Sequence, residues 1–205
     1  MAVAILLVRH GETELNRARV VQPPLTPLSA LGHQQAQALG ERVVREYAVV
    51  AVLASDMLRA QQSAAPAARR LGLTIESDAD LAERNFGVLR GQAYDSLGFD
   101  PTAMDGAPEG GESSAQFQAR VARAWVRITH RAARLEGDLL VVSHGLVVRR
   151  LLEHYLAPQA AASIGVGNAS LTVMASEPPH ALGLVACEAH LGAMVKRTGG
   201  GIVGV

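Results

Sequence analysis

The fold is decided near the N-terminus by residues 2–13, which read AVAILLVRHGET. Residues 2–8 are aliphatic and partly β-branched, which is the pattern of a strand buried on both faces of a parallel sheet. Arg9 and His10 follow this strand directly and therefore stand at its carboxyl end. Open α/β sheets bind their ligands at that edge, so we expect an α/β fold with a ligand site around Arg9 and His10.

Two later stretches repeat this arrangement of a buried strand with a polar end. Ser143-His144-Gly145 follows the apolar residues 139–142, and the stretch SDMLR, residues 55–59, follows the apolar residues 49–54. One polar strand end is commonly incidental, whereas three in one chain indicate a shared site.

The rest of the chain alternates between helical and strand patterns. Further strands are predicted at residues 47–54, 73–76, 139–142, 164–175 and 182–187, and helices at 29–46, 57–71, 113–135 and 146–156. Ser29 and the pair Ser113 and Gln116 are typical helix caps, Gly72 ends a helix, and Pro66 should kink or break one. This alternation predicts a three-layer α/β/α fold with a mostly parallel central sheet.

We expect a single domain over residues 1–205, because no linker or internal repeat divides the chain. Residues 87–112 are rich in Gly and Pro and long for a loop, which is typical of a functional lid. The Gly-rich tail, about residues 196–205, is expected to be flexible.

Composition excludes several classes of protein. The 19 basic and 19 acidic side chains cancel, so no net field favours nucleic acid or an anionic membrane as partner. Cys187 is the only cysteine, which excludes an internal disulfide and a Cys-based zinc site. The N-terminus lacks the basic region of a signal peptide, and no apolar run is long enough to span a membrane, so we predict a cytoplasmic location.

The residue types at the strand ends favour phosphate chemistry. Arg9 and Arg59 each have a planar guanidinium group that can bind two phosphate oxygens at once. Neither His10 nor His144 has the spacing of a zinc motif. A neutral imidazole can attack phosphorus, and nearby arginines favour the neutral form. A leaving alkoxide also needs a proton, and Glu83, at the start of the lid-like segment, is the natural acid.

These same residues carry a resemblance that covers most of the chain, from Ile5 to about His190. The matching motifs are Arg9-His10-Gly11-Glu12-Thr13 with Asn16, Leu28-Ser29 with Gly32, Ser55 with Arg59 and Ser63, Leu81 with Glu83, Gly110-Gly111-Glu112-Ser113, and Ser143-His144-Gly145. In this order they resemble the histidine phosphatase superfamily, the phosphoglycerate-mutase-like proteins. Ser63 stands where Thr is usual, and Leu25 stands where an acidic residue is frequent.

The resemblance implies a role for each matching position. His10 would be the nucleophile, and Glu83 would be the general acid and base. The phosphoryl oxygens would be held by Arg9, Arg59 and His144. Further substrate contacts would come from Gly11, Asn16, Gln22, Arg84 and the amide of Gly145. No metal and no other cofactor is implied.

The resemblance favours a metal-independent phosphatase that hydrolyses a small phosphorylated metabolite. A cofactor-dependent phosphoglycerate mutase is the main alternative, although mutases are typically longer between the acid and the long helix. A phosphate-binding protein without turnover and a phosphatase of protein phosphohistidine also stay open. Phe86, Arg90, Tyr94 and residues 104–112 should set specificity, and the substrate and the choice between monomer and homodimer are left open.

Overall fold

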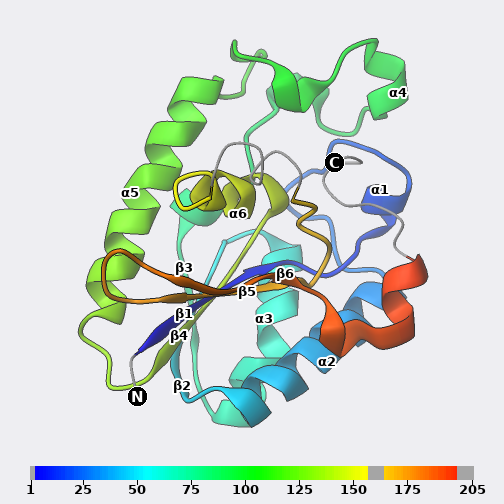
Figure 1. The fold of residues 1–205 in the computed structure, drawn as a ribbon. Coiled ribbons are helices and arrows are strands. Elements are labelled where there is room, and N and C mark those ends of the chain that lie inside the picture. The colour runs from blue at the N-terminus through cyan, green and yellow to red at the C-terminus, as the bar shows by residue number, and fades with distance from the viewer. Residues whose placement is uncertain (1–2, 157–163, 198–205) are drawn as a thin grey trace.

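The computed structural model describes residues 3–156 and 164–197, and a six-stranded sheet lies at its centre (Figure 1). The strands are β1 (Ala4–Arg9), β2 (Val49–Ala54), β3 (Ile75–Ser77), β4 (Asp138–Ser143), β5 (Leu171–Ala175) and β6 (Leu182–Cys187). Their order in the sheet is β3-β2-β4-β1-β5-β6. The first four strands are parallel, whereas β5 is antiparallel to both β1 and β6. The sheet is therefore mixed rather than mostly parallel. The connection from β5 to β6 is short, and a short connection permits only an antiparallel pair.

Two layers of helices cover the sheet and confirm the predicted three-layer fold. On one face lie α2 (Ala30–Glu46) and α3 (Leu58–Leu71), and on the other lie α5 (Ser114–Ala132) and α6 (Gly145–Leu152) (Figure 1). Strand β1 serves both cores, because Leu6 and Val8 pack toward α2 and α3 while Ile5 and Leu7 pack toward α5 and α6. This alternation explains why the strand is apolar at every position before Arg9.

Shorter elements complete the described chain. They are α1 (Glu14–Arg17), α4 (Tyr94–Leu97) and the 3-10 helices η1 (Ala79–Leu81), η2 (Gly87–Leu89), η3 (Pro101–Ala103) and η4 (Ala189–Arg197). Residues 87–112 pass over the carboxyl edge of the sheet (Figure 1). The segment is tied to the chain after β1, because Gly91 N–H donates to the Val21 carbonyl at 2.7 Å and Tyr94 N–H donates to the Arg19 carbonyl at 2.8 Å.

The predicted helix caps are present. The Ser29 hydroxyl accepts the Gly32 amide at 3.0 Å, and Ser113 with Gln116 forms a capping box on α5. Gly72 ends α3 in the left-handed conformation that glycine adopts without strain. Helix α3 continues through Pro66, so of the two predicted alternatives, a kink or a break, the break is excluded.

Several predicted boundaries also differ, and two of them differ most. The strand expected over residues 164–175 begins only at Leu171, because β1 ends at Arg9 and Val8 is the last residue to pair with β5. Helix α6 ends at Leu152 and is followed by turns rather than continuing to Leu156. Most of the tail expected to be flexible lies outside the described residues. Among the helices that are described, none has the length and hydropathy of a membrane span.

The register of the parallel strands brings their carboxyl ends to one level. Arg9 of β1 lies opposite Ser143 of β4, and the His10 amide donates to the Ser143 carbonyl at 2.9 Å. The Ser55 amide, after β2, donates to the Val142 carbonyl at 3.0 Å. Residues that are far apart in the sequence are thus gathered at a single edge of the sheet.

Candidate active site

A pocket opens at this edge, and most of the predicted site residues line it. The lining consists of Arg9, His10, Asn16, Val20, Val21, Gln22, Arg59, Glu83, Arg84, Phe86, Tyr94 and Leu146. Gly11, His144 and Gly145 do not contribute to the lining and lie beside it. The His144 ring is centred 5.1 Å from the His10 ring, and Gly145 is the first residue of α6.

The contacts of His10 define which ring nitrogen carries the lone pair. Its Nδ1 lies 2.7 Å from the Gly11 carbonyl, which can only accept, so Nδ1 carries the hydrogen. Its Nε2 then has the lone pair and accepts from Nε of Arg59 at 3.3 Å. Burial, together with Arg59 and Arg9, holds the pKa of His10 well below its usual range. His10 is therefore a neutral imidazole whose Nε2 can act as a nucleophile.

The loop that carries His10 is fixed against α2 and α3. A Cβ at Gly11 would lie 2.6 Å from the Gly32 carbonyl oxygen, so only glycine allows this approach to α2. The Gly11 amide donates to the Ser63 hydroxyl at 2.9 Å, and that hydroxyl donates to the Arg59 carbonyl at 2.6 Å. Ser63, which stands where the resembled family usually has Thr, thus joins the His10 loop to the turn of helix that carries Arg59.

Arg9 and Arg59 bring positive charge to the pocket, and neither forms an ion pair with a carboxylate in the described part of the chain. Arg9 donates to the Val166 carbonyl at 2.6 Å, and Arg59 donates to the Pro23 carbonyl at 3.1 Å. Both side chains are buried, and burial lowers the pKa of Arg59 to about 10. Two buried cations with only neutral partners make the pocket a receptor for an anion.

Two buried nitrogen atoms beside His10 have no hydrogen-bond partner among the described residues. They are Nε of Arg9 and Nδ1 of His144. The other ring nitrogen of His144, Nε2, lies 2.8 Å from the Ser55 hydroxyl, and burial holds the pKa of His144 well below its usual range. An unsatisfied buried polar atom costs about 1–3 kcal/mol, and an oxyanion bound against His10 would offer both nitrogens an acceptor.

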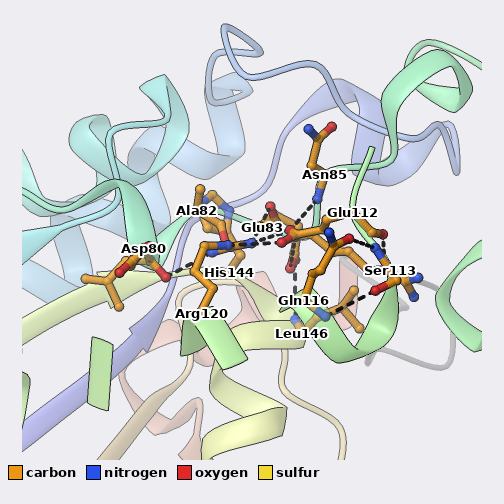
Figure 2. Close-up of polar contacts among 12 residues, drawn as sticks. Asp80, Ala82, Glu83, Asn85, Glu112, Ser113, Gln116, Arg120, His144 and Leu146 are labelled. Carbon is orange, nitrogen blue, oxygen red and sulfur yellow. Dashed lines mark hydrogen bonds and ion pairs between the residues drawn. The ribbon is translucent and has the colours of Figure 1, made fainter. Parts of the chain in front are cut away.

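Glu83 reaches the pocket from the loop after η1, and two backbone amides hold its carboxyl group (Figure 2). Oε1 accepts the Arg84 amide at 3.1 Å, and Oε2 accepts the Leu146 amide at 3.3 Å, in the first turn of α6. Burial raises the pKa of Glu83, although these two hydrogen bonds and the nearby Arg59 oppose the rise. A carboxyl group with a raised pKa can hold a proton closer to neutral pH and can serve as a general acid.

Three residues, Ser55, Val166 and Asn168, make contacts at this site that the sequence did not predict. Ser55 was part of a matching motif, but its partner His144 could not be inferred from spacing. Nδ2 of Asn168 donates to the His10 carbonyl at 3.1 Å and to the Asn16 side chain at 3.2 Å. Residues 164–170 were expected to form a strand, but this segment instead passes beside the site, where the Val166 carbonyl accepts from Arg9 and the Asn168 side chain donates to the His10 carbonyl.

No set of three or more His, Cys, Asp or Glu side chains gathers in a metal-binding arrangement within residues 3–156 and 164–197. The nitrogen atoms that surround His10 belong to histidines and arginines. These groups suit an oxyanion.

Comparisons with known proteins show which sequences and folds this chain resembles. The sequence profile of the histidine phosphatase superfamily (branch 1) matches residues 5–182. Phosphoglycerate mutase-like protein 4 of Arabidopsis thaliana is 36% identical over 164 residues, which cover 73% of this chain and 69% of the relative.

Solved structures are similar over most of the chain. A mycobacterial glucosyl-3-phosphoglycerate phosphatase is 26% identical with a TM-score of 0.74, over 92% of this chain and 100% of the other. A phosphoglycerate mutase from Bacillus anthracis has a TM-score of 0.79 at 24% identity, over 95% of this chain and 97% of the other. At that identity the second likeness supports the fold alone.

Proposed function

This chain belongs to the histidine phosphatase superfamily, and we propose that it is a phosphomonoesterase that hydrolyses a small phosphorylated metabolite through a phosphohistidine on His10. One observation carries the proposal. The lone pair on Nε2 of His10 lies in a pocket that also holds two arginines without carboxylate partners and a carboxyl group, Glu83, with a raised pKa. These are the nucleophile, the anion receptor and the acid that phosphoryl transfer requires.

In the first step, Nε2 of His10 attacks phosphorus and the bond from phosphorus to the ester oxygen breaks. Arg9, Arg59 and Nδ1 of His144 hold the remaining phosphoryl oxygens as charge develops on them. The proton of Glu83 passes to the leaving oxygen, so an alcohol rather than an alkoxide departs. The Gly11 carbonyl, 2.7 Å from Nδ1, stabilises the positive charge that the ring acquires.

In the second step, water attacks the phosphorus of the phosphohistidine and the phosphorus–nitrogen bond breaks. The carboxylate of Glu83 takes a proton from this water and returns to its acid form. His10 regains its neutral ring, and inorganic phosphate leaves. No residue changes its protonation state over the full cycle, and the steps need no metal.

A phosphoglycerate mutase is the second candidate, and the name of the Arabidopsis relative favours it. A mutase must keep its phosphohistidine from water until the substrate returns, which is easier when basic side chains hold a second phosphate. Between Glu83 and Ser113 this chain has two basic residues, Arg84 and Arg90. The Arg84 side chain is engaged with the backbone carbonyls of Glu112 and Gly106. This composition supports hydrolysis.

The test is turnover of a panel of phosphomonoesters, with a chelator present and no metal added. We expect the wild type to release phosphate, His10→Ala to be inactive, and Glu83→Gln to hydrolyse alkyl esters about 10²–10⁴ times more slowly. Isomerisation of phosphoglycerates without net release of phosphate would establish the mutase. Binding of phosphate without any turnover would establish a binding protein.

A further inference from the structure

We propose that Arg120 is a positioning residue for Glu83, holding the backbone around the acid so that its carboxyl group faces the leaving group. The inference rests on the proposed function, in which Glu83 is the general acid. Arg120 does not line the pocket that contains His10, although it lines a neighbouring pocket together with Glu83. Its hydrogen bonds go to backbone carbonyls of residues 80–83 and to Glu112, so we expect its effect on the chemistry to pass through Glu83.

Arg120 lies in the second turn of α5 and directs its guanidinium group at the loop of residues 80–85 (Figure 2). Nη1 donates to the carbonyl of Asp80 at 2.9 Å and to that of Ala82 at 2.8 Å. Nη2 donates to the Glu83 carbonyl at 3.4 Å. One side chain thus holds three of four successive carbonyl groups, including that of the acid itself.

Glu112, the last residue before the cap of α5, completes this arrangement. Its carboxylate pairs with Nη2 of Arg120 and accepts from Nε at 3.2 Å. The same carboxylate accepts the Asn85 amide at 2.8 Å, and the Glu112 amide donates to the Asn85 carbonyl at 2.9 Å. The backbone is therefore held on both sides of Glu83, before it by Arg120 and after it by Glu112 (Figure 2).

This pair is shielded from water, unlike the other ion pairs along α5. The side chains of Arg120 and Glu112 are 14% and 15% exposed, whereas that of Arg127, two turns further on, is 48% exposed. Arg127 binds the carboxylates of Asp78 and Asp80 and so anchors the preceding turn without touching the Glu83 backbone. Arg127 is therefore a matched control, because its loss removes an ion pair between α5 and this loop but leaves the contacts to the Glu83 backbone in place.

The carboxyl group of Glu83 has little freedom of its own. Its partners are the adjacent Arg84 amide and the Leu146 amide of α6, and both contacts depend on where the backbone of residue 83 lies. A general acid must come within about 3 Å of the oxygen that it protonates, and a shift of about 1 Å costs on the order of 10²-fold in rate. Loss of Arg120 should therefore weaken proton transfer more than phosphate binding.

The experiment compares kcat/KM for two esters that differ in their need for an acid. The p-nitrophenolate group leaves without a proton, whereas the best alkyl phosphate of the panel needs one. Arg120→Gln should lower kcat/KM about 10²-fold for the alkyl ester and less than about tenfold for p-nitrophenyl phosphate. Arg120→Lys should recover only part of the loss, because an ammonium group cannot reproduce the fork of a guanidinium. Arg127→Gln should affect both esters equally and weakly.

A double substitution tests the route of the effect. If Arg120 acts through Glu83, the variant Glu83→Gln/Arg120→Gln should hydrolyse the alkyl ester no more slowly than Glu83→Gln alone. Equal losses on both esters, or losses that multiply in the double variant, would overturn the inference. Circular dichroism establishes whether each variant folds. If Arg120→Gln does not fold, the rates of Arg120→Lys on the two esters test the inference in its place. A wild type inactive on every ester would instead refute the proposed function, and this inference with it.

Discussion

Acidification should destabilise this fold through the two histidines of the pocket. His10 and His144 are both buried, and burial with the nearby arginines holds their pKa values well below 6.5, the value expected in the unfolded chain. Below that pH the unfolded chain binds protons at these positions and the folded chain does not. The free energy of unfolding must then fall as the pH falls, until the folded pKa values are reached.

The size of the effect follows from proton linkage. One pH unit below the unfolded pKa changes the unfolding free energy by about 1.4 kcal/mol for each group that stays unprotonated in the fold. Between about pH 7.5 and about pH 5.5, His10 and His144 together should therefore remove about 3 kcal/mol. That is a large part of the stability of a typical domain, about 5–15 kcal/mol.

Other groups titrate in the same range, so the wild-type slope alone cannot identify the histidines. Burial raises the pKa of Glu83, which stabilises the fold as the pH falls, and burial lowers the pKa of His190 to about 4, which has the opposite effect. These contributions cancel when a variant is compared with the wild type at the same two pH values. We would use His10→Asn and His144→Gln, whose amides are uncharged and retain a hydrogen-bonding group.

The assay is urea unfolding of the three proteins at about pH 7.5 and about pH 5.5. Each variant should lose about 1.4 kcal/mol less than the wild type between these conditions, with an unchanged dependence on urea concentration. If His10→Asn loses as much stability as the wild type, His10 is not held neutral in the folded protein. The argument that it is a ready nucleophile would then be refuted.

Three further outcomes follow from the site. Arg59→Met should lower kcat/KM for every phosphate ester by about 10²–10³, because it removes a preorganised donor, and steady-state kinetics on both ester types checks this. Gly32→Ala should cost about 1–3 kcal/mol in urea unfolding, because its Cβ would lie 2.0 Å from the Glu12 carbonyl, whereas Gly106→Ala meets no atom within 4 Å and should be nearly neutral. For alkyl esters, kcat/KM should fall as the pH rises through the pKa of Glu83, which burial raises above 4.5, and Glu83→Gln should abolish this dependence.

The sequence was sufficient to predict which parallel strand ends gather at the site. Arg9 and His10, Ser55, and Ser143 with His144 each follow an apolar run, and parallel strands place such residues on one edge. The roles of Arg120 and Glu112 could not be found in this way. Arg120, Arg123, Arg127 and Arg131 recur every three or four residues along α5, which is also the pattern of an ordinary solvated helix face. Only the fold shows that Arg120 turns inward to the loop of Glu83.

Asn168 was missed for a topological reason. Residues that follow a parallel strand reach the carboxyl edge of the sheet, but in an antiparallel strand the residues that precede it do so. Since β5 is antiparallel to β1 and pairs Leu171 with Val8, the residues just before Leu171 lie beside His10. The Asn168 side chain and the Ala169 amide both donate to the His10 carbonyl, and the Val166 carbonyl accepts from Arg9. In a mixed sheet, a search for site residues must therefore include the chain before each antiparallel strand as well as the chain after each parallel one.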